Sequence, residues 1–444
     1  MQTDRANKNN QSVIAKNELG QKSVERKPRL LWANCYCLLD KSSGASISVN
    51  QILTQFVKNG FEVEILGATI FDNKSGSNHL SKQIEKAKKK SKLLEVKDKL
   101  LTHSLLVTES TSRMDMKLSE TTEWYKNYVN KLNSFRPDCV FYYGGNPWDL
   151  LIPDEARMRK IPSVAYLVNA NYQSARWCRD VDEIVTDTVA TANFYKNSVG
   201  FAPKPIGKFI DPSNVIAEKH LRKHITFINP SWEKGAGIVA MLAIILEKKR
   251  PDIIFEIVQS RGDWGQVVKI VSTEIFNEER DALKNVIVTA NTNKMAEVYS
   301  RSRVILGLSL WWESGSRVLA EAMLNGIPAI VSNFGGSPEM VGSGGVIVDL
   351  PEECHNEPFL TLPKVDRLQS IADLLEKLWD DESFYLNLMS KSLHQGMTLH
   401  QMNSSTKKLL NVFAPLIDKR AGDYDLSKII HENHKQLKFK KRTT

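Results

Sequence analysis

The 444-residue sequence contains only five cysteines and no run of 18 or more apolar residues. A membrane-spanning helix needs about 20 predominantly apolar residues, so the sequence predicts none. Its polar start, MQTDRANKNNQSVIAKNELG, also lacks the apolar stretch of a secretory signal. The cysteines are odd in number and scattered, which disfavours a disulfide framework and favours core thiols in a reducing compartment. We therefore expect a cytoplasmic protein.

Excess positive charge is missing from most of the chain. The net charge is +9, but residues 1–28 contribute +3, residues 82–99 contribute +5 and residues 435–444 contribute +5, which leaves −4 for the remainder. This distribution disfavours nucleic-acid binding, which needs a basic face on a folded module. Lysine clusters of this kind suit anionic lipid headgroups, such as those of the inner membrane face, but a solvated helix and tail would have the same composition.

Apolar runs of strand length alternate with helical patterns along most of the chain, which predicts an α/β protein with two doubly wound, Rossmann-like domains. We expect a disordered basic tail (1–28), an N-terminal acceptor domain (29–205) with a basic insert (82–99), and a C-terminal donor domain (206–400). Helices at 401–434 are expected to pack back toward the N-terminal domain, before a basic tail at 435–444. The predicted strands cover 29–39, 61–71, 137–145, 162–170, 224–230, 252–260, 285–291, 303–310 and 327–333.

The most informative segment runs from Trp311 to Ser332. A strand ends near Leu310, Glu313 follows in the loop, and a helix that contains Glu321 begins around Gly315. Both carboxylates can then face the crevice at the carboxyl ends of the strands, where one accepts hydrogen bonds from sugar hydroxyls and the other from a ribose. Small residues at 314–316 leave the backbone N–H groups at the helix start open to a phosphate.

This segment resembles retaining glycosyltransferases of family 4. The two glutamates are followed by Gly326-Ile-Pro328 and then by Gly335-Gly-Ser-Pro-Glu339, as in that family. The resemblance implies the GT-B fold, in which two Rossmann-like domains face each other across a cleft. It also implies transfer of a sugar from a UDP- or GDP-linked donor to a hydroxyl acceptor, with retention of the anomeric configuration, in glycan or glycoconjugate biosynthesis.

A second match lies upstream, where ITFINPSWEKGAGIVAMLAII resembles the family's strand, loop and Lys-Gly element. The resemblance gives Lys234 the role of binding the donor pyrophosphate. The family often has an arginine where this chain has Asn229, so Lys234, amides at the helix start and Arg317 or Arg261 would balance the charge. The expected donor-binding residues are Glu321, Gly315, Ser316, Arg317, Val318, Asn229, Arg261 and Trp312, whose ring could stack on sugar or base.

The N-terminal half matches less closely. Ser43, Gly44 and Ala45 occupy the glycine-containing loop after the first strand, where such enzymes contact donor phosphate or acceptor; a plain turn is the alternative. Asn169 and Asn171 stand where the family commonly carries a histidine near the reacting sugar carbon. The resemblance thus implies Glu313, Lys234 and Asn169 as catalytic residues, with Asn171 on the acceptor side.

The expected mechanism needs neither a metal nor a cofactor. No Asp-x-Asp stands at a strand end apart from Asp180-Val-Asp182, which is poorly placed, so Lys234 and backbone amides would stabilise the departing diphosphate. Two alternatives stay open: a sugar-nucleotide epimerase or hydrolase on the same fold, and a degenerate, non-catalytic subunit. A nicotinamide-dependent enzyme is disfavoured because its Gly-x-Gly-x-x-Gly fingerprint is missing.

Overall fold

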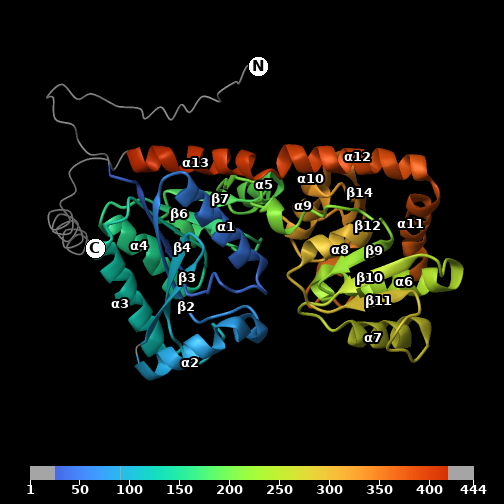
Figure 1. The fold of residues 1–444 in the computed structure, drawn as a ribbon, viewed down its shortest axis with the longest axis horizontal. Helices are drawn as coiled ribbons and strands as arrows, with labels where there is room; N and C mark the ends of the chain where they lie inside the picture. The colour runs from blue at the N-terminus through green and yellow to red at the C-terminus, as the bar shows by residue number, and fades with distance from the viewer. Residues whose placement is uncertain (1–25, 91, 419–444) are drawn as a thin grey trace, which may run out of the picture.

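A computed structural model describes residues 26–90 and 92–418. These residues form two α/β domains that lie side by side (Figure 1), and the segment 206–223 connects the two sheets. The predicted basic tail 435–444 lies outside the described residues, as do residues 1–25 of the predicted tail 1–28. The N-terminal tail predicted at 1–28 includes described residues: the Arg26 guanidinium binds the buried carboxylate of Asp138 at 2.6 Å. The described chain is therefore anchored ahead of Arg29.

The first domain contains an eight-stranded sheet with the order β3-β4-β2-β1-β5-β6-β7-β8. Neighbouring strands are parallel except β3, which runs antiparallel to β4. Of the eight strands, the sequence predicts β1, β2, β5 and β6, because strands covered on both faces consist of near-continuous apolar residues. The bounds of all eight are β1 (Arg29–Ala33), β2 (Glu62–Ala68), β3 (Leu93–Asp98), β4 (Leu101–Leu106), β5 (Cys139–Tyr142), β6 (Ser163–Leu167), β7 (Glu183–Thr186) and β8 (Lys204–Pro205).

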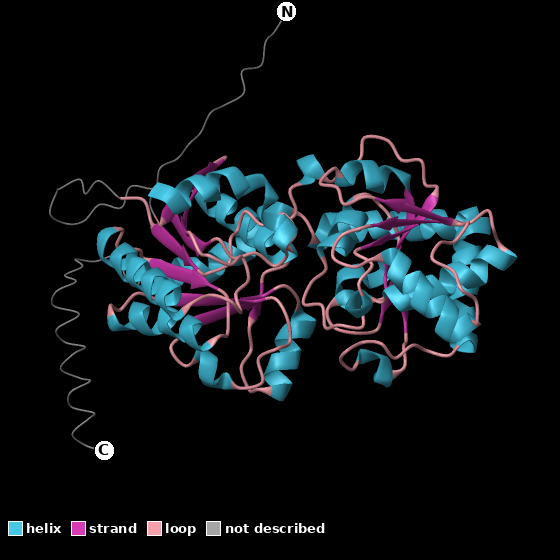
Figure 2. Cartoon of the chain, turned by 90° about the horizontal axis from the view of Figure 1, so that it is seen from below, coloured by secondary structure: helices cyan, strands magenta, loops and turns pink. Residues whose placement is uncertain are grey.

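Helices cover both faces of this sheet (Figure 2). Helix α1 (Gly44–Lys58) packs Ile52 and Phe56 into one core cluster, whereas α3 (Leu118–Ser134) and α4 (Leu151–Met158) build the other around Tyr128 and Ile152. Helix α5 (Val189–Ser198) follows β7. The spacing of the apolar residues in α1 is helical, so one face is buried and the other meets solvent.

Two details of this domain differ from the prediction. The first strand ends at Ala33 rather than 39, because the Asn34 side chain accepts a hydrogen bond from the Tyr36 amide and turns the chain. The basic insert is an integral part of the fold: it forms α2 (Ser81–Lys90) and strand β3, and Ile84 packs into a small core with Leu105. One face of the helix buries Ile84 and Ala87, whereas one face of the edge strand is partly buried.

Four of the five cysteines are buried and free, as predicted for core thiols, whereas Cys178 is partly exposed. Burial raises the pKa of both Cys35 and Cys37 to about 12. A thiol with so high a pKa carries almost no thiolate at neutral pH and is unreactive.

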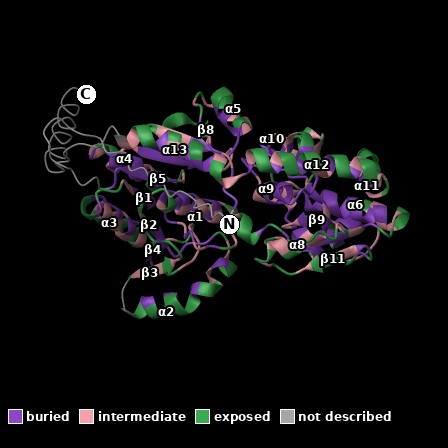
Figure 3. Ribbon diagram, turned by 45° about the horizontal axis from the view of Figure 1, so that its top comes forward, coloured by how far each residue is buried: buried purple, intermediate pink, exposed green. Residues whose placement is uncertain are grey.

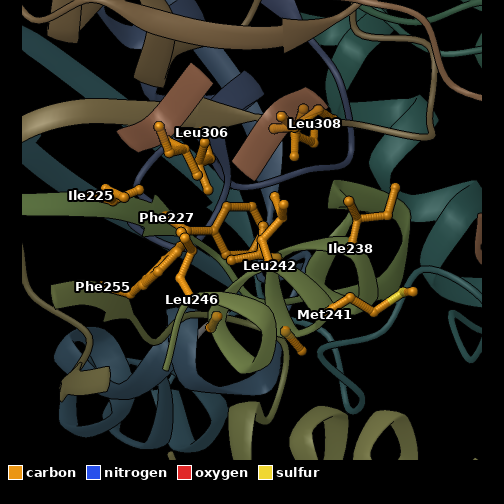
Figure 4. Packing of buried hydrophobic residues seen from close by; sticks show 14 of the residues in the cluster. Ile225, Phe227, Ile238, Met241, Leu242, Leu246, Phe255, Leu306 and Leu308 are labelled. Atoms are coloured by element: carbon orange, nitrogen blue, oxygen red, sulfur yellow. The ribbon is translucent and has the colours of Figure 1, made fainter. Parts of the chain in front are cut away.

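The second domain contains a six-stranded parallel sheet with the order β11-β10-β9-β12-β13-β14. Helix α6 (Ala236–Lys249) is buried along most of its length (Figure 3), and Leu242 and Leu246 pack with Phe227 and Phe255 (Figure 4). The strands are β9 (His224–Ile228), β10 (Ile254–Val258), β11 (Val286–Thr289), β12 (Ser302–Gly307), β13 (Ala329–Ser332) and β14 (Gly345–Val348).

The remaining helices of this domain are α7 (Trp264–Phe276), α8 (Met295–Arg301), α9 (Arg317–Leu324), α10 (Ser337–Val341), α11 (Gln369–Asp380) and α12 (Glu382–Leu399). Helix α13 (Met402–Asp418) then runs back over the first domain (Figure 1), where Phe413 contacts Phe56 and Phe141. Residues 419–434 of the predicted C-terminal helices lie outside the described residues. No helix in the described part of the chain has the length and apolar character needed to cross a bilayer.

Candidate active site

A cavity of about 340 Å³ lies between the two sheets, at the carboxyl ends of their central strands. The first domain lines it with the loop after β1, the end of β6 and the connecting segment, and the second domain with the loops after β9 and β12 and the start of α9. In doubly wound folds, ligands bind at this edge of the sheets. The lining residues predicted from the sequence are Gly44, Ala45, Asn169, Asn229, Lys234, Arg261, Glu313, Gly315, Ser316, Arg317 and Val318.

The central feature of the cavity is an ion pair between Lys234 and Glu313. Lys234 ends a short 3-10 turn (Trp232–Lys234), and the neighbouring Glu233 carbonyl accepts hydrogen bonds from the Leu310 and Trp311 amides at 2.9 and 3.1 Å. The two loops are thus joined through their backbones. Gly235 adopts a left-handed conformation with φ of 87°, and a Cβ there would meet the Leu308 carbonyl oxygen at 2.1 Å. Only glycine lets these loops approach so closely.

Glu321 lies behind the cavity wall rather than on it. One carboxylate oxygen accepts a hydrogen bond from Arg317 and the other from the Tyr299 hydroxyl, each at 2.8 Å. The Glu321 residue is 6% exposed, and burial raises the pKa of the Tyr299 hydroxyl well above its usual value. In the structure Glu321 holds Arg317, whose other contacts are the Gln51 side chain and the Phe209 carbonyl, each at 3.1 Å.

Asn229 and Arg261 lie together at the second-domain side of the cavity. The Asn229 side-chain oxygen accepts a hydrogen bond from the Arg261 amide at 3.0 Å. The Arg261 guanidinium then reaches across to the first domain, where it meets Asp72 at 3.1 Å and the Ser42 carbonyl at 3.3 Å. Arg261 thus connects the domains at the entrance.

In the predicted loop after the first strand, some residues line the cavity and another supports the start of α1. Gly44 and Ala45 line the cavity, whereas Ser43 is buried and caps α1 by accepting a hydrogen bond from the Ser46 amide. Asn169 also lines the cavity. Asn171 does not: it is exposed, and its amide donates to the Asn169 side-chain oxygen. Ser43 therefore supports the start of α1, and the backbone of Asn171 holds the Asn169 side chain; neither residue lines the cavity.

Of the two adjacent tryptophans beside Glu313, Trp312 was predicted to bind the donor, but it does not line the cavity. Trp311 lines the cavity, whereas Trp312 points into the domain contact. The Trp312 ring packs against Phe194 and Phe334, with centroids at 4.5 and 5.3 Å, and its indole N–H donates to Thr191. Neighbouring residues in an extended loop point to opposite sides, so a stacking role would fall to Trp311, not Trp312.

Sequence reasoning missed Lys208, which lines the cavity from the segment between the domains. Its ammonium group binds Asp187 at 2.7 Å, and the other Asp187 oxygen accepts a hydrogen bond from the Tyr166 hydroxyl at 2.5 Å. Lys208 and Asp187 are 5% and 3% exposed. Lys208 lies in a Pro/Gly-rich stretch that resembles a plain linker, so no local pattern marks it.

In the part of the chain that the structure describes, no group of three or more histidine, cysteine, aspartate or glutamate residues could hold a metal ion. Asp182 of the Asp-Val-Asp sequence instead binds the Ser163 amide, and Asp180 pairs with Arg157 and Arg179.

The two sheets, the facing loops and the cavity between them define the GT-B fold. Residues 231–385 match the model of the family glycosyl transferases group 1. The predicted fold and the resemblance to glycosyltransferases are confirmed.

Solved structures match over both domains. Sucrose-phosphate synthase from Thermosynechococcus elongatus is 12% identical, with a TM-score of 0.62 over 89% of this chain and 100% of that chain. HepE from Anabaena, solved with UDP-glucose, is 12% identical, with a TM-score of 0.63 over 87% and 99%. A glycosyltransferase from Rickettsia africae is 14% identical, with a TM-score of 0.62 over 88% and 99%. A search of the curated proteins found no match.

Proposed function

We propose that the chain is a retaining glycosyltransferase that moves a hexosyl or related unit from a UDP- or GDP-linked sugar to a hydroxyl acceptor without a metal ion. The observation that carries this proposal is the Lys234–Glu313 pair in a cavity between two facing sheets, beside the start of α9. The solved structure of Anabaena HepE with UDP-glucose supports a nucleotide-sugar donor.

The charges of the cavity suit the leaving group. Breaking the bond between sugar and phosphate leaves negative charge on a diphosphate, which Lys234 and the backbone amides of Gly315 and Ser316 would stabilise. Glu313 would accept hydrogen bonds from the sugar hydroxyls and orient the ring. A diphosphate oxygen takes the acceptor proton in this scheme, so the protein supplies no separate base.

An epimerase or hydrolase on this fold would need acid–base residues beside the sugar. No histidine lines the cavity among the described residues, which favours transfer over those reactions. An assay without acceptor separates them: release of nucleoside diphosphate together with a new sugar nucleotide would indicate an epimerase.

The experiment for the donor site is a thermal-shift panel of UDP, GDP and ADP, each with magnesium and with EDTA. We expect one diphosphate to raise the melting temperature equally in both conditions. Lys234→Ala should abolish this shift because it removes the main positive charge near the phosphates. Lys294→Ala is the matched control, since Lys294 lies on the same domain, 71% exposed and away from the cavity. Stabilisation only with magnesium, or an intact shift in Lys234→Ala, would contradict the proposal.

We further propose that the acceptor side faces an anionic membrane. The lysines of α2 at 82, 86, 88 and 89 are exposed, whereas Ile84 and Ala87 of the same helix are buried. Each such charge contributes roughly 1 kcal/mol near an anionic surface. Vesicles containing 30% phosphatidylglycerol should co-sediment the protein in low salt and release it in 0.5 M salt, and replacing the four lysines by glutamine should prevent binding. Binding to neutral vesicles, or no binding at all, would contradict the membrane proposal and would indicate that α2 is a solvated helix.

A further inference from the structure

Lys208 is the most deeply buried cation of the cavity, and the fold fixes it from three sides. The Gly207 amide donates to the Asp187 carbonyl at 3.0 Å, and the Ser405 hydroxyl of α13 donates to the Lys208 carbonyl at 2.8 Å. The side chain then reaches Asp187 at 2.7 Å. A lysine held this firmly presents its charge at one place.

That place is beside the start of α9. A Cβ at Gly315 would lie 3.1 Å from the Asp187 Oδ2 atom, and the same oxygen accepts the hydrogen bond from Lys208. The ammonium group is therefore next to the loop whose amides would face a phosphate.

The arginines that line the cavity are less available to bind an anion at the start of α9. Arg317 is committed to Glu321, Gln51 and a carbonyl, and Arg261 is 40% exposed at the entrance, where it binds Asp72. Lys234 alone would leave one of two phosphates without a cationic partner.

The stability of the fold does not explain why the Lys208–Asp187 ion pair is buried. A buried ion pair must overcome the cost of removing two charges from water, and well-packed apolar residues are often as stable or more so. Lys208 also borders open space rather than filling a core. A charge kept at such cost on the wall of a cavity indicates a ligand of opposite charge.

We infer that Lys208 is a second diphosphate-binding cation, which is positioned by Asp187 and Tyr166. This inference rests on the proposed donor site. Upon binding, a phosphate oxygen shares the ammonium group with Asp187, and the lysine stays charged throughout.

The test compares Asp187→Asn with the double variant Asp187→Asn/Lys208→Met by isothermal titration calorimetry with UDP, GDP and inorganic pyrophosphate. This comparison removes the lysine without leaving a buried carboxylate unpaired, and the Tyr166 hydroxyl can still donate to the amide oxygen of Asn. The matched control is Glu183→Gln/Lys204→Met, which removes an exposed ion pair between β7 and β8, the strands that precede Asp187 and Lys208. Melting temperatures check that each variant is folded.

We expect Asp187→Asn to bind diphosphate and pyrophosphate at least as tightly as wild type, because a competing negative charge is gone. The double variant should bind each about tenfold more weakly than Asp187→Asn, with a shallower salt dependence. Equal affinities of these two variants would overturn the role of Lys208 while leaving the donor site intact, provided that Lys234→Ala still abolishes binding. If wild type binds neither diphosphate nor pyrophosphate, the donor site and this inference fail together.

Discussion

Gly315 offers a sharp test of the domain contact, because it faces Asp187 of the other domain with almost no free space. A Cβ built at position 315 would lie 2.6 Å from the Asp187 Cβ and 3.1 Å from its Cγ. Carbon atoms pack at about 3.5–4.0 Å, so Gly315→Ala must push the two backbones apart by roughly 1 Å. Overpacking of this size typically costs about 1–3 kcal/mol. The displaced Asp187 would carry Lys208 with it.

Gly44→Ala is the matched control, since Gly44 lines the same cavity and begins α1. A Cβ there would meet only the Arg317 Cδ at 3.8 Å, an ordinary contact. Alanine is also the better helix former by up to about 1 kcal/mol. Urea denaturation should therefore show a loss of about 1–3 kcal/mol for Gly315→Ala and none for Gly44→Ala. Nucleoside diphosphate binding should also weaken in Gly315→Ala, because the displaced Asp187 moves Lys208. Equal stability and affinity of Gly315→Ala and wild type would refute the placement of this loop against Asp187.

Two further predictions concern stability. Burial lowers the pKa of His103 and of His400 to about 4 from an ordinary value of 6.5. Between pH 6.5 and pH 4 the unfolded chain binds protons on these histidines that the folded chain does not. The free energy of unfolding should therefore fall as the pH drops, by about 2 kcal/mol per histidine between pH 7 and pH 5. Urea titrations at pH 7 and 5 measure this, and His103→Leu should remove its share; an unchanged pH dependence would contradict the burial argument. Glu339 accepts hydrogen bonds from the Val189 and Ala190 amides at 2.9 and 2.7 Å, so it caps α5 from the other domain. Glu339→Ala should cost about 1 kcal/mol in the same titration, whereas Glu297→Ala, on the exposed side of α8, should cost little.

The sequence was informative where local pattern and burial coincide. Parallel strands buried on both faces have apolar runs, so the alternation of strands and helices was predictable for most of both sheets. The hairpin of β3 and β4 was not, because the edge strand Leu93–Asp98 carries Glu95, Lys97 and Asp98, which look like part of a solvated insert. Its identity as a strand depends on pairing with β4, which a local pattern does not reveal.

The site shows the same division. Lys234, Glu313 and Gly315 lie in segments whose small residues and spacing predict a loop followed by a helix, and all three line the cavity. Trp312 could not be distinguished from Trp311, since adjacent loop residues differ only in the side to which they point. Lys208 carries no local signal at all, because its partner Asp187 becomes a neighbour only when β7 and β8 pair.

The Lys234–Glu313 pair has a consequence for how the proposed donor would bind. Nucleoside diphosphate alone would take Lys234 and leave Glu313 without its partner, whereas a sugar nucleotide would also offer hydroxyl groups to that carboxylate. A buried charged group that loses its partner costs about 1–3 kcal/mol or more, so the sugar nucleotide should bind about tenfold or more tightly than the diphosphate. Glu313→Gln should strengthen binding of the diphosphate, because Lys234 is then free of the opposing charge, and should abolish the advantage of the sugar.

Turnover should fall in the same variant, since the amide accepts fewer hydrogen bonds from the sugar and positions it less firmly. Calorimetry with the diphosphate and with its sugar nucleotide, on wild type and Glu313→Gln, gives all four affinities, and an activity assay gives the rate. If the diphosphate binds both proteins equally well, the ion pair does not oppose the leaving group, and Glu313 has no part in distinguishing donor from product.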